Sequence, residues 1–271
     1  MGRELYESDP AAKAILDRAN EVLGYDLKSI MFEGPAETLT NTRYAQPAIY
    51  TCSAMHLEKA KESGIEYDYV AGHSLGEYSA LYAAGVFSFE DGLRLVDKRG
   101  LAMSEQNGKG TMAAVLGLTE EELEPYLVLG VVMANLNSKT QIVVSGTESG
   151  IDEIIKALTE KEITVKKLSV SAAFHSPQME EAAKIMTEAM ESVEFRDPKC
   201  YVVSNVTGKA SKDAEVIKDN LIRQITGQVR WYDSINGLVD AGISQFYEVG
   251  HGKVLRKMNK TITLTPKCLS I

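Results

Sequence analysis

Apolar and polar positions alternate along this chain of 271 residues with two periods, one typical of strands and the other of helices. Short apolar runs rich in β-branched and aromatic residues predict strands at residues 69–71, 201–206 and 245–249. Helical spacing covers much of the first sixty residues and then residues 89–105, 177–193, 213–225 and 232–241. This alternation predicts an α/β protein with a largely parallel sheet.

The segment from residue 110 to residue 170 has a different pattern. It predicts a strand "TMAAVLGL", a helix "TEEELEPYL", the strands "VVMANLN" and "TQIVVSG", a helix "GIDEIIKALTEK" and a strand "ITVKKLSV". Thr119 and Glu122 have the spacing of a capping box. The order βαββαβ is that of the ferredoxin-like unit. We therefore expect a ferredoxin-like small domain at 110–171, inserted into a large α/β domain formed by 1–109 and 172–271.

Composition indicates a folded, soluble protein, with 44% hydrophobic and 25% charged residues. No apolar run approaches the ~20 residues of a membrane helix, and the N-terminus lacks a signal-peptide core, so we expect a cytoplasmic location. The net charge of −9 argues against nonspecific binding to nucleic acid, which needs an excess of Lys and Arg. The cysteines Cys52, Cys200 and Cys268 fit neither a disulfide framework nor a zinc site, and we expect buried thiols.

A basic set near the C-terminus departs from this acidic average. It consists of Lys253, Arg256, Lys257 and Lys260, at helical spacing. Such a set is either an ordinary solvated helix face or a local patch for an acidic protein partner.

The stretch "YVAGHSLGEYSALYAAG", residues 69–85, places Ser74 between Gly72 and Gly76. This G-x-S-x-G pattern lies between a predicted strand and a predicted helix, which is the context of a nucleophile elbow and of an α/β-hydrolase-like large domain. The glycines allow a sharp turn, and the helix N-terminus offers backbone N–H groups to an oxyanion. The same five residues also fit a purely structural turn.

A serine needs a base to act as a nucleophile, and the chain has four histidines. His56 lies in a helical stretch where a surface or packing role is expected, and His73 belongs to the turn itself, with its side chain directed away from that of Ser74. His251 follows a strand end, where a loop role is favoured. His175 follows the last strand of the inserted unit, where the chain returns to the large domain, and it is the best candidate for the base.

Arg99 shares a helical face with Val96 and Met103. An arginine on an apolar face either extends its charged end to solvent or binds an anion, and a guanidinium can hold a carboxylate through two hydrogen bonds. Periodicity alone favours the first alternative. Taken together, Ser74, His175 and Arg99 indicate acyl transfer from a substrate that carries a carboxylate.

Seven blocks of this sequence, in order and over essentially its whole length, resemble malonyl-CoA:acyl carrier protein transacylases, which include the acyltransferases of polyketide synthases. The blocks are "GHSLGEYSAL", "RLVDKRGLAM", "GTMAAVLGL", "NSKTQIVVSG", "VSAAFHSPQM", "RQITGQVRW" and "YEVGHGKVL". The resemblance implies transfer of malonyl from malonyl-CoA to the phosphopantetheine thiol of acyl carrier protein, in a ping-pong reaction without a metal or redox cofactor.

The resemblance also implies roles for single residues. Ser74 is the acylated nucleophile, His175 is its base, and Arg99 binds the malonyl carboxylate. In this family a backbone carbonyl orients the histidine, and Gln224 matches that position. The backbone N–H of Leu75 supplies one donor to the oxyanion.

Phe174 is expected to influence substrate choice. The tetrapeptide from Ala172 to His175, "AAFH", resembles the malonyl-selective form "HAFH" more than the methylmalonyl form "YASH". A bulky Phe174 would crowd an α-methyl group, and one misfitted methyl changes selectivity by ~1–3 kcal/mol. The less favoured alternative is that Phe174 is an ordinary core residue.

In the family, a first strand ending in "GQGSQ" precedes a segment that resembles "MGRELYE" of this sequence, and the glutamine of that strand supplies the second oxyanion donor. This strand is absent from the present sequence. We expect a chain without this strand to be less stable and less active, and the strand's absence leaves open a noncatalytic module that binds carrier protein. An acyl hydrolase of the same fold is the other alternative, although a hydrolase gains nothing from a carboxylate-binding Arg99.

Overall fold

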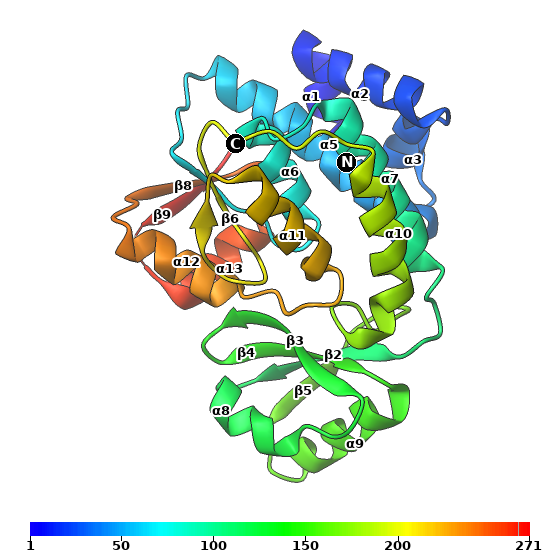
Figure 1. Cartoon of the computed structure of the whole chain (residues 1–271), viewed down its shortest axis with the longest axis vertical. Helices are drawn as coiled ribbons and strands as arrows, with labels where there is room; N and C mark the ends of the chain where they lie inside the picture. The colour runs from blue at the N-terminus through cyan, green and yellow to red at the C-terminus, as the bar shows by residue number, and fades with distance from the viewer. Residues whose placement is uncertain (265) are drawn as a thin grey trace.

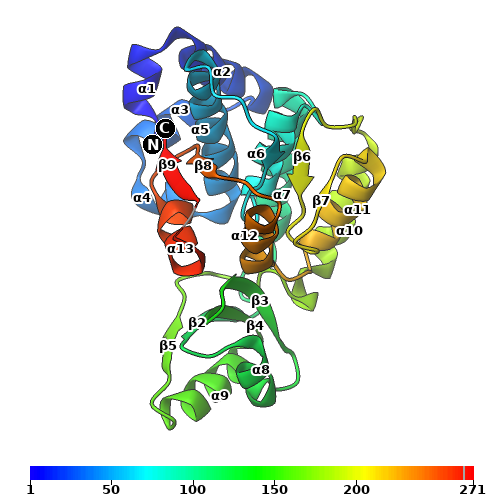
Figure 2. The same ribbon diagram turned by 90° about the vertical axis from the view of Figure 1, so that its left-hand side faces the viewer.

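Figure 1 shows the computed structural model of the chain, which describes residues 1–264 and 266–271. Most helices lie with two small sheets at one end of the molecule, and a four-stranded sheet lies with its own helices at the other end. The view turned by 90° in Figure 2 shows the same separation. Within the described residues, no helix has both the length and the hydropathy needed to cross a membrane.

The first sixty residues are mostly helical, as the periodicity predicts. The side chain of Asp9 caps the second helix by accepting the N–H groups of Ala11 and Ala12, and Asn41 caps the long fifth helix. The helices are α1 (Arg3–Ser8), α2 (Pro10–Leu23), α3 (Leu27–Glu33), α4 (Ala36–Thr40) and α5 (Thr42–Glu62).

The central segment is a short strand followed by two helices. They are β1 (Tyr69–Val70), α6 (Gly76–Ala84) and α7 (Phe89–Ser104). The hydroxyl of Ser88 accepts a hydrogen bond from the N–H of Asp91 at 3.0 Å, so Ser88 caps the N-terminus of α7.

The second half of the chain returns to the helical end of the molecule. Predicted and observed helix bounds agree within a few residues, and the segment predicted as a helix at 177–193 begins with a 3₁₀ turn. The elements are η2 (Pro177–Met179), α10 (Glu180–Glu191), β6 (Tyr201–Val203), β7 (Ala210–Ser211), α11 (Ala214–Gln224), α12 (Trp231–Asp240), β8 (Gln245–Glu248), α13 (Val254–Ile262) and β9 (Lys267–Ser270).

The prediction of a largely parallel sheet is wrong, because parallel pairing among the described residues is confined to two pairs of strands. Strand β6 pairs in parallel with β1 but antiparallel with β7, and β8 pairs in parallel with β9 in a separate two-stranded sheet. The chain reverses after β6 because the Ser204 N–H bonds to the Lys209 carbonyl and Gly208 takes a positive φ of 65°. The strand predicted at 201–206 therefore stops at Val203.

The four-stranded sheet has the order β3-β4-β2-β5, and all its neighbours are antiparallel. Its elements follow one another in the predicted order: β2 (Thr111–Leu116), α8 (Glu120–Leu123), η1 (Glu124–Tyr126), β3 (Val131–Ser138), β4 (Gln141–Gly146), α9 (Glu148–Thr159) and β5 (Thr164–Lys167). The capping box is confirmed, since Thr119 and Glu122 exchange hydrogen bonds between side chain and backbone. Pro125, which lacks an N–H group, lies where α8 gives way to a 3₁₀ turn.

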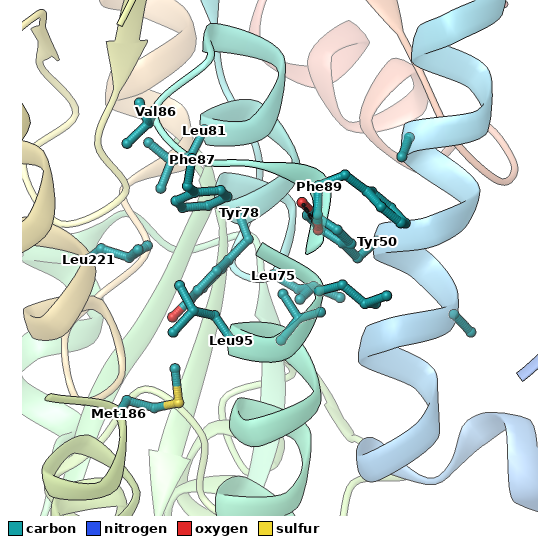
Figure 3. Close-up of a cluster of buried hydrophobic side chains, with 14 of the residues drawn as sticks. Tyr50, Leu75, Tyr78, Leu81, Val86, Phe87, Phe89, Leu95, Met186 and Leu221 are labelled. Atoms are coloured by element: carbon teal, nitrogen blue, oxygen red, sulfur yellow. Dashed lines mark hydrogen bonds between the residues drawn. The ribbon is translucent and has the colours of Figure 1, made fainter. Parts of the chain in front are cut away.

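Helices α5, α6 and α7 enclose the main hydrophobic core. Figure 3 shows Tyr50 of α5, Tyr78 and Leu81 of α6 and Phe89 of α7 in one buried cluster. The Tyr50 and Phe89 rings are stacked with centroids 5.7 Å apart. The four-stranded sheet has a separate core against α9, so each end of the molecule packs around its own apolar cluster.

Two helical glycines offer a matched test of this packing. A side-chain carbon at Gly92 of α7 would overlap the Tyr50 hydroxyl and the Phe87 ring, whereas one at Gly237 of α12 meets only the Gly208 carbonyl at 3.5 Å. We expect Gly92→Ala to lower the free energy of unfolding by about 1–3 kcal/mol through overpacking. Gly237→Ala should be neutral or raise it by about 0.5–1 kcal/mol because alanine favours a helix. Urea denaturation measures both, and equal effects would contradict this account of the core.

Candidate active site

The turn between β1 and α6 holds Ser74 in a left-handed backbone conformation, with φ of 52°. A serine rarely adopts this conformation, so neighbouring contacts must hold it. A side chain at Gly72 would collide with the carbonyl of Gly76, which means that the turn requires glycine at position 72. The geometry is that of the strand–turn–helix predicted from the sequence.

His175 lies directly against this serine. Its Nε2 atom is 2.7 Å from the Ser74 Oγ, and its Nδ1 atom is 2.9 Å from the backbone carbonyl oxygen of Gln224. Because a carbonyl only accepts, Nδ1 carries the proton and Nε2 is free to accept one from the serine. The sequence-predicted pair and the carbonyl expected to orient it are therefore in contact.

The His175 ring is almost fully buried, with 4% of its surface exposed. Burial and, to a smaller extent, the positive charge of Arg99 lower the pKa of His175 from 6.5 to about 3, although the hydrogen bond that Nδ1 makes to the Gln224 carbonyl opposes this shift. His175 is consequently neutral at physiological pH, which is the form that can accept a proton.

Arg99 is buried as well, with 1% exposure, so the expectation that its charged end reaches solvent is wrong. Its Nη1 donates to the Gln46 Oε1 at 2.7 Å, and its Nη2 donates to the Gln224 Oε1 at 3.0 Å and to the Ser74 Oγ at 3.2 Å. The guanidinium also lies 5.5 Å from the centre of the Tyr78 ring. Amide oxygens and an aromatic face thus surround a buried cation that an anion could approach at Ser74.

The backbone N–H of Leu75 lies at the N-terminus of α6, and no hydrogen bond links it to another described residue. An unpaired N–H at a helix N-terminus is suited to receive negative charge. This is the position expected for one oxyanion donor.

Three further residues complete the site, and the sequence reasoning missed them. Gln46 binds Arg99, Asn205 accepts the Ser74 N–H at 2.6 Å, and Glu77 accepts the Gln224 Nε2 at 2.7 Å. Glu77 was within the block "GHSLGEYSAL", one helical turn after Ser74. Gln46 was a polar residue beside Pro47 inside an apolar helical segment, and Asn205 carried no comparable signal.

The remaining histidines lie away from the Ser74 side chain. His56 bonds to the Cys52 carbonyl within α5, and His251 lies exposed in the loop before α13, as expected. His73 is 2.8 Å from the Asn137 Oδ1 of β3, a contact that ties the turn to the four-stranded sheet.

Phe174 is half-buried and packs against two hydrophobic clusters, one at each end of the molecule. Its packing agrees with a core role, and its part in substrate choice stays a prediction. Among the cysteines, Cys52 and Cys200 are buried as expected, whereas Cys268 is only partly buried because β9 is an edge strand.

The basic set lies on α13 and at its N-terminus. Lys253, Lys257 and Lys260 are exposed, and Arg256 is partly buried. This arrangement agrees with a solvated helix face and does not test the alternative of a partner-binding patch.

The buried neutral His175 predicts a specific dependence of stability on pH. The unfolded state binds a proton below about pH 6.5, whereas the native state does so only near pH 3, so stability falls as the pH drops through this range. We expect His175→Gln to lose about 1–2 kcal/mol less free energy of unfolding between pH 7 and pH 4.5 than the wild type loses. Urea denaturation at the two pH values measures this. His56→Gln is the control and should behave as the wild type, while an unchanged loss in His175→Gln would contradict the prediction.

Comparison with known proteins identifies the family of this chain. The acyl transferase domain family matches residues 1–266. The malonyl CoA-acyl carrier protein transacylase of Bacillus subtilis is 44% identical, over 100% of this chain and 88% of its own length. The acyl-carrier-protein S-malonyltransferase structure from Bartonella henselae has a TM-score of 0.96 and 36% identity, covering 100% of this chain and 90% of that one.

A second solved structure contains a malonyl-transacylase in complex with a type II polyketide acyl-carrier protein. It has a TM-score of 0.95 and 33% identity, and covers 100% of this chain and 91% of that one. With the whole chain matched in sequence and in fold, this protein belongs to the acyl transferase domain family, among the malonyl-CoA:acyl carrier protein transacylases.

Proposed function

We propose that this protein moves malonyl from malonyl-CoA to the phosphopantetheine thiol of acyl carrier protein, through a malonyl ester on Ser74. The observation that carries the proposal is the convergence of two groups on one oxygen. The Ser74 Oγ lies 2.7 Å from the His175 Nε2 and 3.2 Å from the Arg99 Nη2. The product serves fatty-acid or polyketide synthesis.

The first half-reaction forms the ester. His175 takes the hydroxyl proton of Ser74 at Nε2 while Oγ attacks the thioester carbonyl carbon. The carbonyl oxygen becomes an oxyanion that accepts the Leu75 N–H. The C–S bond then breaks, and the imidazolium returns the proton to the departing CoA sulfur.

The second half-reaction runs the same steps with a new thiol. The thiol of the carrier's phosphopantetheine gives its proton to His175 and attacks the ester carbonyl. The C–O bond to Ser74 breaks, and Oγ recovers the proton. The chemistry needs no metal or redox cofactor.

Arg99 gives the site its selectivity for a carboxylate. A malonyl carboxylate at the guanidinium replaces part of the solvation lost on burial. It also offsets the positive charge that lowers the pKa of His175, so a carboxylate-bearing donor makes the base stronger. This buried arginine argues against an acyl hydrolase, and the hydrogen-bonded serine and histidine argue against a noncatalytic module.

Several finer features belong to the same proposal. Residues 1–109 and 172–271 form an α/β-hydrolase-like large domain, and 110–171 form a ferredoxin-like small domain, as the separate apolar cores support. Phe174 disfavours α-methylated donors. The three free thiols agree with a reducing, cytoplasmic location.

The covalent step has a direct test. Malonyl-CoA should raise the intact mass of the wild-type protein by one malonyl group. Ser74→Ala should abolish the increase, and His175→Ala should slow it by roughly 10²–10⁴-fold because the base is lost. His56→Ala serves as the control and should label normally. Labelling that persists in Ser74→Ala would reject Ser74 as the nucleophile.

The carboxylate role of Arg99 is tested with two donors. Arg99→Ala should lower kcat/KM for malonyl-CoA by roughly 10²-fold or more, because a buried charge partner is removed, and should affect acetyl-CoA far less. Arg94→Ala, on the same helix but exposed, is the matched control and should change neither. Equal losses with both donors would make Arg99 a structural residue.

A further inference from the structure

Glu77 is a buried acid that the reaction described above does not use. It lies in the first turn of α6, one turn after Ser74, and only 1% of its surface is exposed. Carboxyl groups are almost never fully buried without partners, so the contacts of Glu77 show what it does.

One oxygen of Glu77 accepts two hydrogen bonds. Its Oε2 lies 2.7 Å from the Gln224 Nε2 and 3.3 Å from the Asn205 backbone N. Both donors belong to residues that hold the backbone of Ser74. Asn205 accepts the Ser74 N–H at 2.6 Å, and the Gln224 Nε2 also donates to the Ser74 carbonyl at 2.8 Å. Glu77 therefore accepts hydrogen bonds from Asn205 and Gln224, the two residues that bond to the Ser74 backbone.

The contact with Glu77 determines which way the Gln224 amide faces. With Nε2 directed at the Glu77 carboxyl and the Ser74 carbonyl, Oε1 must face Arg99, which donates to it at 3.0 Å. The reversed amide would set an oxygen against two acceptors and an NH₂ group against a cation. Glu77 thus selects the orientation that solvates Arg99.

The same residue, Gln224, supplies the carbonyl that accepts the His175 Nδ1 at 2.9 Å. Gln224 is the last residue of α11 and is fully buried, so its side chain fixes the position of its own backbone. A displacement of the Gln224 side chain would therefore alter the positions of both His175 and Arg99.

The charged and titratable groups around Glu77 are Arg99 on α7 and Tyr78 on α6. Burial raises the pKa of Glu77 to about 7, against the lowering effects of Gln224, the Asn205 N–H and the charge of Arg99. Both contacts of Oε2 are accepted bonds, which the carboxylate and the carboxylic acid can each accept.

We propose that Glu77 is a positioning residue for acyl transfer, which acts by holding the Gln224 amide so that Arg99 and His175 keep their places at Ser74. This inference rests on the proposed roles of those three residues. Glu77 touches neither the substrate nor the reacting atoms.

The experiment measures the rate of Ser74 labelling by intact mass over a range of malonyl-CoA concentrations up to saturation and, separately, over a range of acetyl-CoA concentrations, so that both the maximal rate and the KM are obtained. Glu77→Ala should slow malonyl labelling roughly 10–100-fold and raise the KM for malonyl-CoA, because both Arg99 and His175 lose their support. Acetyl labelling should slow less, since only the loss at His175 applies to it. Glu77→Gln keeps an acceptor oxygen for Gln224 and should stay within about 3-fold of the wild type.

Two further variants make the outcome decisive. Gln224→Ala should resemble Glu77→Ala, and the double variant should be little slower than either single variant if Glu77 acts through Gln224. Glu90→Gln, in the first turn of α7 and paired with Arg18, is the control and should label normally. Thermal melting of each variant separates a loss of fold from a loss of positioning.

Several results would overturn the proposal. They are normal labelling by Glu77→Ala, a Glu77→Gln variant as slow as Glu77→Ala, or additive losses in the double variant. Equal losses with malonyl-CoA and acetyl-CoA at an unchanged KM would also overturn it. If the wild type itself took no label on Ser74, the proposed function would fail instead, so the two failures are distinguishable in one assay.

Discussion

The left-handed backbone at Ser74 is the constraint on which the rest of the site depends. A non-glycine residue in this conformation costs about 1–3 kcal/mol, so the surrounding structure has to over-determine it. Asn205 bonds to the Ser74 N–H and the Gly72 carbonyl, and Gln224 bonds to the Ser74 carbonyl. Helix α6 then starts directly after the serine and packs against α5 and α7, with Tyr78 and Leu81 in the apolar cluster of Figure 3. Hydrogen bonds to the Ser74 backbone and the apolar packing of α6 together stabilise this strained conformation.

The positive charge of Arg99 is buried beside Ser74. A cation removed from water needs other polar partners, and for Arg99 two amide oxygens and the face of the Tyr78 ring supply them. Burial lowers the pKa of the Arg99 guanidinium, but the group stays protonated and positively charged. Among the described residues, the direct hydrogen-bond partners of this cation are neutral groups. Such an environment favours the binding of an anion, which supports the proposed role of Arg99.

The four-stranded sheet is joined to the rest of the molecule at the same place. Backbone hydrogen bonds of 2.8 Å link Leu136 and Ala134 of β3 to Val229, and His73 bonds to Asn137. The chain that leaves β5 carries His175 back to Ser74. Ser74 and His175 therefore lie on segments that precede and follow the four-stranded sheet along the chain.

The sequence by itself determined the features that depend on neighbours within a few residues. The caps at Ser88 and Thr119, the order of elements in the four-stranded sheet and the turn at Ser74 follow from local hydrogen bonding, periodicity and glycine's freedom. The choice of His175 came from its place after the last strand of the inserted unit, and the family resemblance supplied the roles of Arg99 and Gln224. Only the tertiary structure decided that Arg99 is buried, that β6 pairs antiparallel with β7, and that Gln46, Asn205 and Glu77 belong to the site. The physical reason is distance along the chain: Asn205 meets Ser74 across 131 positions and Gln224 meets Glu77 across 147, and no local pattern encodes which distant amide a buried polar group will meet.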